Sequence, residues 1–113
     1  MANEGKAPMI LHFVRMEVSA DKRKEVWQTI RSLAAELKKE TECVESGFYQ
    51  NAEDENDFLF WGMWTERKAL DIYLQSVQFT VLIGARSLLR RPPEITIHSI
   101  SHSSELEVPH SKT

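Results

Sequence analysis

The sequence predicts one α+β domain whose strands and helices follow in the order β-α-β-β-α-β. The chain has 113 residues, 42% of them hydrophobic, which is the size of a single domain with one modest core. Four short segments carry the apolar alternation or apolar runs of strands, and two regions between them carry helical spacing. No internal repeat or low-complexity segment in the sequence favours another architecture.

The first two elements are a strand over 9–18 and a helix over 21–40. Apolar residues stand on both faces of the first segment for much of its length, which is typical of a strand that is covered on both sides. In the second segment the apolar residues recur at spacings of three and four. They are Val26, Ile30, Leu33, Ala34 and Leu37. This is the clearest helix in the sequence.

A hairpin follows, with strands over 43–51 and 58–64 joined by an acidic turn over 52–57. A second helical region begins at Glu66, breaks near Ser76 and resumes over 78–90, before two prolines. The last strand spans 94–100, with the prolines confined to its entry, where no ladder hydrogen bond is needed.

Right-handed crossovers and a central hairpin place these strands in one four-stranded antiparallel sheet with the helices on one face, the ferredoxin-like arrangement. Residues 58–64 are nevertheless apolar on both faces. Phe58, Phe60 and Trp64 point one way, and Leu59, Trp61 and Met63 point the other. The uncovered face needs a partner, and a second copy of the chain is the simplest one. We therefore expect a homodimer through the open sheet face, a dimeric α/β barrel. The alternative is a monomer whose polar tail covers that face.

The composition of the chain also predicts its domain boundaries and excludes several kinds of partner. We expect a flexible amino terminus over 1–7, a domain over 8–100 and a polar carboxyl-terminal tail over 101–113. No apolar run approaches the roughly 20 residues of a membrane span, and no secretory signal is visible, so we expect a cytoplasmic protein without a membrane partner. A net charge of −3 gives no attraction to nucleic acid. The lone Cys43 excludes an internal disulfide, and we predict no metal site.

Arg86 is one candidate site residue. On the predicted helix it falls on the same stripe as Phe79 and Ile83, and a guanidinium that faces an apolar interior requires an anion or a hydrogen-bonded partner. It would then hold an acidic or oxygen-rich ligand between helices and sheet. The alternative is an ordinary contact with a carboxylate or with the last carbonyls of the helix.

Trp64 is a second candidate. Gly62 lies two residues earlier on the same strand face as Trp64 and Phe60, and an aromatic wall beside a side-chain gap can seat a flat ligand. Tyr73, His12 and Arg86 are the polar residues that we expect to converge there. The alternative is that these aromatic residues are simply core, and that His12 is a strand histidine with an ordinary structural role.

The segment from Glu40 to Leu89 resembles the antibiotic biosynthesis monooxygenase family, and with the flanking strands the resemblance spans about residues 8 to 100. It rests on short motifs in a fixed order. They are Glu42-Cys43, Phe48-Tyr49, Asp54-Glu55-Asn56, Met63-Trp64-Thr65-Glu66, Ala69-Leu70 and Ser76-Val77-Gln78-Phe79. The resemblance implies a ferredoxin-like unit that dimerises through its sheets. It also implies oxidation of aromatic polyketides or quinols by dioxygen without metal or flavin.

By position, Trp64 matches the family's cavity tryptophan, and Arg86 lies where some members place a helix arginine. Tyr73 replaces the family's usual histidine, so a phenol would take the place of an imidazole. The asparagine and histidine of the haem-degrading branch are absent from the matching positions, which favours an organic substrate over haem.

These observations predict a monooxygenase, without a cofactor, that acts on a small aromatic or quinol-like molecule. The candidate catalytic residues are Trp64, Arg86, Tyr73 and His12, and the candidate substrate-binding residues are Phe60, Gly62, Phe79 and Ile83. One alternative is a dimeric ligand-binding protein of the same fold without catalysis. Another is a small-metabolite isomerase in which His12 acts as the base.

Overall fold

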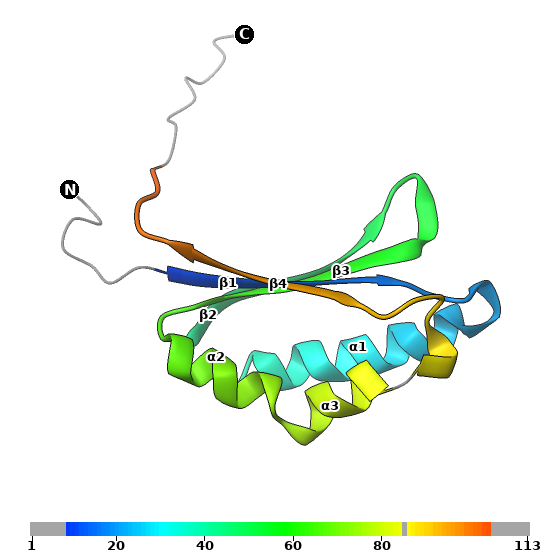
Figure 1. Ribbon diagram of the computed structural model, residues 1–113, viewed down its shortest axis with the longest axis horizontal. Coiled ribbons are helices and arrows are strands. Elements are labelled where there is room, and N and C mark those ends of the chain that lie inside the picture. The colour runs from blue at the N-terminus through cyan, green and yellow to red at the C-terminus, as the bar shows by residue number, and fades with distance from the viewer. Residues whose placement is uncertain (1–8, 85, 105–113) are drawn as a thin grey trace, which may run out of the picture.

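Four antiparallel strands form one sheet in the order β2-β3-β1-β4, and the described helices all lie on one side of it (Figure 1). This computed structural model describes residues 9–84 and 86–104. The strands are β1 (Met9–Glu17), β2 (Cys43–Asn51), β3 (Asp54–Trp64) and β4 (Glu94–Ile100). The helices are α1 (Arg23–Leu37), α2 (Arg67–Leu74) and α3 (Val77–Gly84), with short 3₁₀ turns η1 (Ala20–Lys22) and η2 (Arg86–Leu88). The predicted ferredoxin-like α+β fold is confirmed.

The hairpin between β2 and β3 is longer than predicted. β3 begins at Asp54, which pairs with Asn51, so residues 52–57 are not all turn. The side-chain oxygen of Asn51 accepts a hydrogen bond from the backbone N–H of Glu53 at 2.8 Å, which closes a tight turn. Acidic residues that look like loop in the sequence therefore extend the strand.

The helix predicted over 78–90 is too long, because α3 ends at Gly84. The backbone that follows η2 bonds to the end of β1 instead. The N–H of Ser19 donates to the carbonyl of Leu88 at 3.0 Å, and the N–H of Arg90 donates to the carbonyl of Glu17 at 2.8 Å. These bonds need an extended chain around Leu89, so a helix cannot continue through it.

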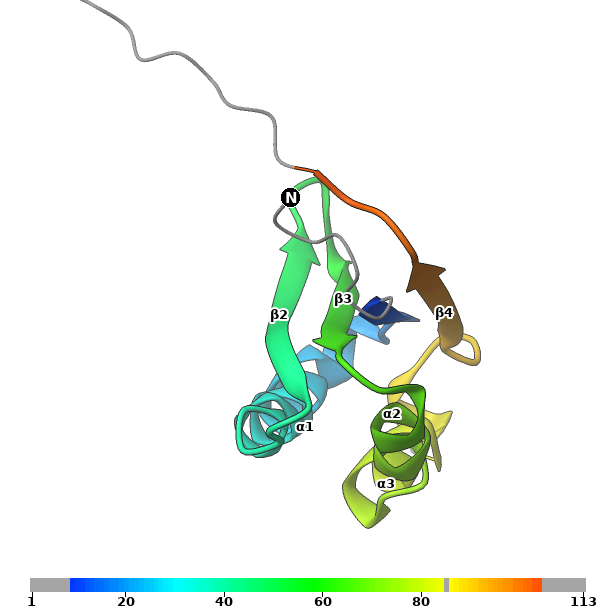
Figure 2. The ribbon, with the colours of Figure 1, turned by 90° about the vertical axis from the view of Figure 1, so that its left-hand side faces the viewer.

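The core lies between the sheet and the helices. Figure 2 shows α1 on the β2 side of the sheet and α2 with α3 on the β4 side. Helical spacing on α1 turns Val26, Ile30, Leu33 and Leu37 inward, and all four are buried. From the sheet, alternate residues of β1 and β3 meet them. These are Ile10, His12, Val14, Met16, Phe58, Phe60 and Trp64.

The opposite face of the sheet is bare of described elements (Figure 1). Leu59, Trp61 and Met63 point to it and are half-buried, so the predicted division of the β3 side chains between two faces is confirmed. Within the described ranges, no helix is long and apolar enough to cross a membrane. The predicted amino-terminal segment lies outside the described residues, as does the predicted tail apart from 101–104.

Candidate functional site

His12 is a polar residue at the centre of the core. It lies on β1, the strand between β3 and β4, and its side chain points to the helix side with no exposure to solvent. Three aromatic rings surround its imidazole, with centroid distances of 5.5 Å to Phe60, 5.9 Å to Tyr73 and 6.1 Å to Trp64. The structure thus brings together four of the residues that the sequence singled out.

Trp64 is hydrogen-bonded to His12. The indole Nε1–H donates to His12 Nδ1 at 2.9 Å, in a pair that is buried on both sides. An indole nitrogen can only donate, so Nδ1 must be the unprotonated nitrogen and Nε2 must carry the proton. Burial lowers the pKa of His12 from 6.5 to about 4, so the ring is neutral at pH 7.

Gly62 makes this pair possible. It stands directly opposite His12 in the register of β1 and β3. A Cβ atom at position 62 would lie 2.7 Å from Cε1 of His12 and 3.1 Å from Nε1 of Trp64. The side-chain gap predicted at Gly62 is therefore real, but the His12 and Trp64 side chains fill it. The prediction that this gap seats a ligand is wrong, because the glycine makes room for protein atoms.

Tyr73 supplies the second polar group of the cluster. It lies on α2, is 6% exposed, and packs at centroid distances of 5.4 Å from Trp64 and 5.6 Å from Phe79. Burial is the main cause that raises the pKa of its phenol, and the neighbouring Cys43 and Glu40 add to the effect. The hydroxyl therefore stays protonated at neutral pH and is available as a hydrogen-bond donor.

Two polar atoms of this cluster have no hydrogen-bond partner among the described residues. They are Nε2 of His12 and the hydroxyl oxygen of Tyr73, and both are buried. Buried polar groups in folded proteins are almost always paired, so two such atoms on neighbouring rings are unusual.

An apolar groove of about 420 Å³ lies beside this cluster, between α3 and β4. Its lining residues are Leu74, Phe79, Thr80, Ile83, Gly84 and Ile95. Phe79 belongs both to the groove wall and to the aromatic contact with Tyr73. A second groove of about 290 Å³ shares Ile83 and continues along Leu89 to Arg90 and Arg91. The structure therefore places two of the predicted substrate-binding residues, Phe79 and Ile83, at a groove.

The predicted alignment of Arg86 with Phe79 and Ile83 on one helix is wrong. Arg86 lies in η2, beyond the end of α3, so the helical stripe that would align it with Phe79 and Ile83 does not reach it. Its side chain lies outside what the structure describes. His98, the other strand histidine, points to the open face and packs edge-on against Phe13 at 5.5 Å.

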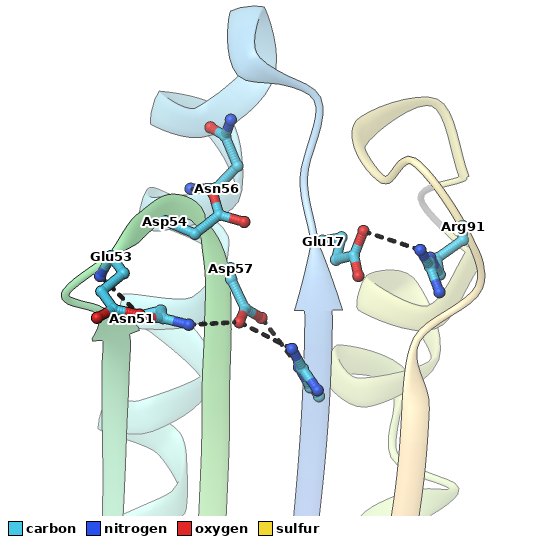
Figure 3. A network of polar contacts seen from close by, with 8 residues as sticks. Glu17, Asn51, Glu53, Asp54, Asn56, Asp57 and Arg91 are labelled. Atoms are coloured by element: carbon cyan, nitrogen blue, oxygen red, sulfur yellow. Dashed lines mark hydrogen bonds and ion pairs between the residues drawn. The ribbon is translucent and has the colours of Figure 1, made fainter.

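Sequence reasoning missed the groove residues Leu74, Thr80, Gly84 and Ile95, because nothing in their spacing marks them as lining residues. It also missed a polar cluster on the open sheet face, where Figure 3 shows Asn51 and Asp57 side by side at the ends of β2 and β3. The side-chain amide of Asn51 donates to Asp57 at 3.0 Å, and Arg15 forms an ion pair with the same carboxylate. Within the described part of the chain, no group of three or more His, Cys, Asp or Glu residues could hold a metal ion.

Comparison with known proteins gives one relative by sequence and several by structure. An uncharacterized protein of Synechocystis sp. PCC 6803 is 29% identical over 92 residues, which are 80% of this chain and 63% of that protein. The chain thus spans less than two thirds of the length of this relative. A conserved protein of Methanosarcina mazei has 25% identity and a TM-score of 0.74, with 81% of this chain and 92% of that chain covered.

A more distant structure shares the fold more closely. A protein of Deinococcus radiodurans, described provisionally as an antibiotic biosynthesis monooxygenase, has a TM-score of 0.80 at 17% identity, with 88% of this chain and 99% of that chain covered. At that identity the likeness shows the fold alone. The family model described as "Antibiotic biosynthesis monooxygenase" matches residues 9–84, about two thirds of the chain. The chain therefore belongs to the antibiotic biosynthesis monooxygenase family.

Proposed function

We propose that the chain is a monooxygenase that oxidises a small aromatic or quinol-like substrate with dioxygen and needs no metal or flavin. The observation that carries the proposal is the buried cluster of His12, Trp64 and Tyr73, which has two unpartnered polar atoms and contacts the groove residue Phe79. Membership of the family supports the same reaction class. A flat apolar substrate suits the groove lining, and its oxygen substituents suit the polar atoms.

The reaction balances without an external reductant. When a ring methylene of an anthrone-type substrate becomes a carbonyl, carbon gains one oxygen atom of dioxygen, and the two hydrogens leave with the other oxygen atom as water. The protein's part is to bind the electron-rich, deprotonated form of the substrate and to keep water away from it. Arg86, two residues after the groove residue Gly84 in sequence, is our candidate for steadying the negative charge.

Oxygen uptake tests this proposal. A panel of anthrones and dihydroxynaphthalenes is incubated with the protein in an oxygen electrode, and isotopically labelled dioxygen is followed into the product by mass spectrometry. We expect uptake with at least one compound and one labelled oxygen atom per product molecule. Tyr73→Phe should slow the reaction about 100-fold, whereas Val81→Ala, a change at an exposed residue of α3, should not. No uptake across the panel by folded protein contradicts the proposal.

The isomerase alternative fits the geometry less well, because it requires His12 as a base. Its Nδ1 lone pair is used by Trp64, its Nε2 carries the proton, and burial lowers its pKa. A ligand-binding protein without catalysis is the better second candidate. The same two unpartnered atoms favour it, because binding a ligand oxygen requires only hydrogen-bond donors.

We also propose that the working form is a homodimer through the open face of the sheet. Leu11, Phe13, Leu59, Trp61 and Met63 gather there on the central strands and are only half-buried in one chain. Two such faces packed together would bury an interface on the order of 2,000 Å². We place this dimer in the cytoplasm, where the lone Cys43 would stay reduced.

A further inference from the structure

The His12 and Tyr73 side chains each offer a free hydrogen-bond donor. The bond from Trp64 occupies the acceptor nitrogen of His12, so the remaining Nε2–H can only donate. The Tyr73 phenol keeps its proton, because burial raises its pKa. The two rings lie 5.9 Å apart, and neither Nε2 nor the hydroxyl has a partner among residues 9–84 and 86–104.

From this geometry we infer that Nε2–H of His12 and the hydroxyl of Tyr73 form a binding site for one anionic or carbonyl oxygen of the ligand. Trp64 is the positioning residue of this site. It does not touch the ligand oxygen, but it holds His12 in the tautomer that donates. This inference rests on the proposed function, and it names the group on the substrate that the cluster recognises.

The chemistry of the site selects its ligand. A deprotonated phenol or enol, or a quinone carbonyl, accepts hydrogen bonds and suits two neutral donors. An amine or a cation would meet no acceptor at Nε2 and could use only the hydroxyl oxygen of Tyr73, so it should bind more weakly than an oxyanion. Because His12 offers no lone pair, the site binds an oxyanion that forms in solution or during entry and does not extract the proton itself.

Phe79 is the residue that the groove and the aromatic cluster share. This side chain lines the groove between α3 and β4 on one side and packs 5.6 Å from the Tyr73 ring on the other. Figure 2 shows α3 below the β4 edge of the sheet, in agreement with the groove between them. A ligand that enters from the groove would have to displace the Phe79 ring to reach the Tyr73 ring. Truncation of this residue should therefore speed binding.

Binding of a chromophoric phenol tests the inference without reference to oxygen chemistry. The probe is 4-nitrophenol, and 4-nitroanisole, which has the same ring but no ionisable oxygen, is the matched control ligand. At a pH where free 4-nitrophenol is half ionised, binding to the wild-type chain should increase the absorbance of the ionised form. Phe79→Ala should raise the association rate, whereas Val81→Ala on the exposed side of α3 should leave it unchanged.

Tyr73→Phe separates a binding role from a structural one. The Tyr73 hydroxyl has no partner within the described residues, so its removal should not lower the melting temperature of the free protein. The variant should lose about 10-fold in affinity for the nitrophenolate and keep its affinity for 4-nitroanisole. A lower melting temperature with an unchanged preference for the anion would instead assign the hydroxyl to a bound water, and the inference would fall.

Trp64→Phe tests the positioning role. Nitrogen-detected correlation spectra of the wild-type protein should show His12 with its proton on Nε2 only, and the variant should show both tautomers and a weaker preference for the anion. A proton on Nδ1 in the wild type, or no binding of either probe to wild type and Phe79→Ala, overturns the inference. If anion binding follows these expectations but the protein consumes no dioxygen with any compound, the monooxygenase proposal fails. The inferred site for a ligand oxygen atom at His12 and Tyr73 then still stands.

Discussion

Arg15 on β1 and Asp57 on β3 form a two-bond ion pair, with Nε donating to Oδ1 at 3.1 Å and Nη2 donating to Oδ2 at 3.0 Å. The side-chain amide of Asn51 adds a third hydrogen bond to the same carboxylate (Figure 3). The Asp57 residue is only 7% exposed, whereas the Arg15 side chain is 55% exposed. Together these bonds, chiefly the one from Arg15, hold the pKa of the Asp57 carboxyl below its usual value.

This pair predicts a loss of stability in acid. A carboxylate with a lowered pKa in the fold binds protons more readily when unfolded, so its contribution is complete above about pH 4 and is lost as pH falls through the lowered pKa. Asp57→Asn should lower the unfolding free energy at pH 7 and flatten its decline below pH 4, as measured by urea unfolding. Asp71→Asn, which breaks an exposed pair with Arg67 on α2, is the control. If the unfolding free energies of wild type and Asp57→Asn declined in parallel below pH 4, the expectation would be contradicted.

His12 predicts a second and separate pH window. Its pKa is about 4 in the fold against 6.5 ordinarily, so between these values the unfolded chain binds a proton that the folded chain does not. Stability should fall as pH drops from 6.5 to 4, by about 3 kcal/mol in all, because each tenfold difference in proton affinity is worth about 1.4 kcal/mol.

The same urea titration in two variants checks this window. His12→Gln should remove most of the slope between pH 6.5 and 4, whatever its effect on stability at pH 7. His98→Gln, at an exposed strand histidine, should keep the slope. An unchanged slope in His12→Gln would show that His12 is not held neutral in the fold.

Gly62→Ala should be strongly destabilising although it adds a single methyl group. The new Cβ would lie 2.7 Å from the His12 ring and must displace either that ring or the Trp64 indole from their hydrogen bond. We expect a loss of about 1–3 kcal/mol in unfolding free energy, the usual cost of overpacking a core. Gly84→Ala is the control, because a Cβ there meets nothing within 4 Å. Equal stability of the two variants would contradict the packing described for Gly62.

Trp61→Glu tests the homodimer. Trp61 lies opposite Phe13 on the open face, and a glutamate there would bury an unpaired charge in the proposed interface. Light scattering should give about 26 kDa for the wild type, twice the 13.1 kDa of one chain, and a smaller or unfolded particle for the variant. Val81→Glu on exposed α3 should leave the mass unchanged. A wild-type particle of one chain at micromolar concentration would contradict the dimer.

The fold could be predicted from the sequence because the buried residues of each helix or strand recur at the spacing of that element. The spacing of Val26, Ile30 and Leu33 identifies α1, and the alternation from Phe58 to Trp64 identifies β3. The prediction failed beyond Gly84, because the backbone at Leu88–Arg90 is set by hydrogen bonds to Glu17 and Ser19, about 70 residues away along the chain. The spacing of apolar residues within one segment cannot predict hydrogen bonds to a segment so far away.

The candidate site was predicted in part for a similar reason. His12, Trp64 and Tyr73 could be found as polar groups on apolar faces. The hydrogen bond between Trp64 and His12 spans 52 residues of sequence and depends on the register that sets His12 opposite Gly62. That register follows from the whole sheet, so the sequence alone suggested an empty space where the structure shows two packed side chains.

The position of His12 also bears on how this protein could evolve. The residue pairs with Gly62 on one neighbouring strand and with Ile97 on the other, at the middle of the sheet. A substitution there would change the proposed ligand site and the folding of the core together, so few mutations would be tolerated. Thr80 and Ile95 in the groove are exposed and can change one at a time. Selection for a new ligand would therefore act first on α3 and β4, and descendants with different ligand ranges would keep the same buried cluster around His12.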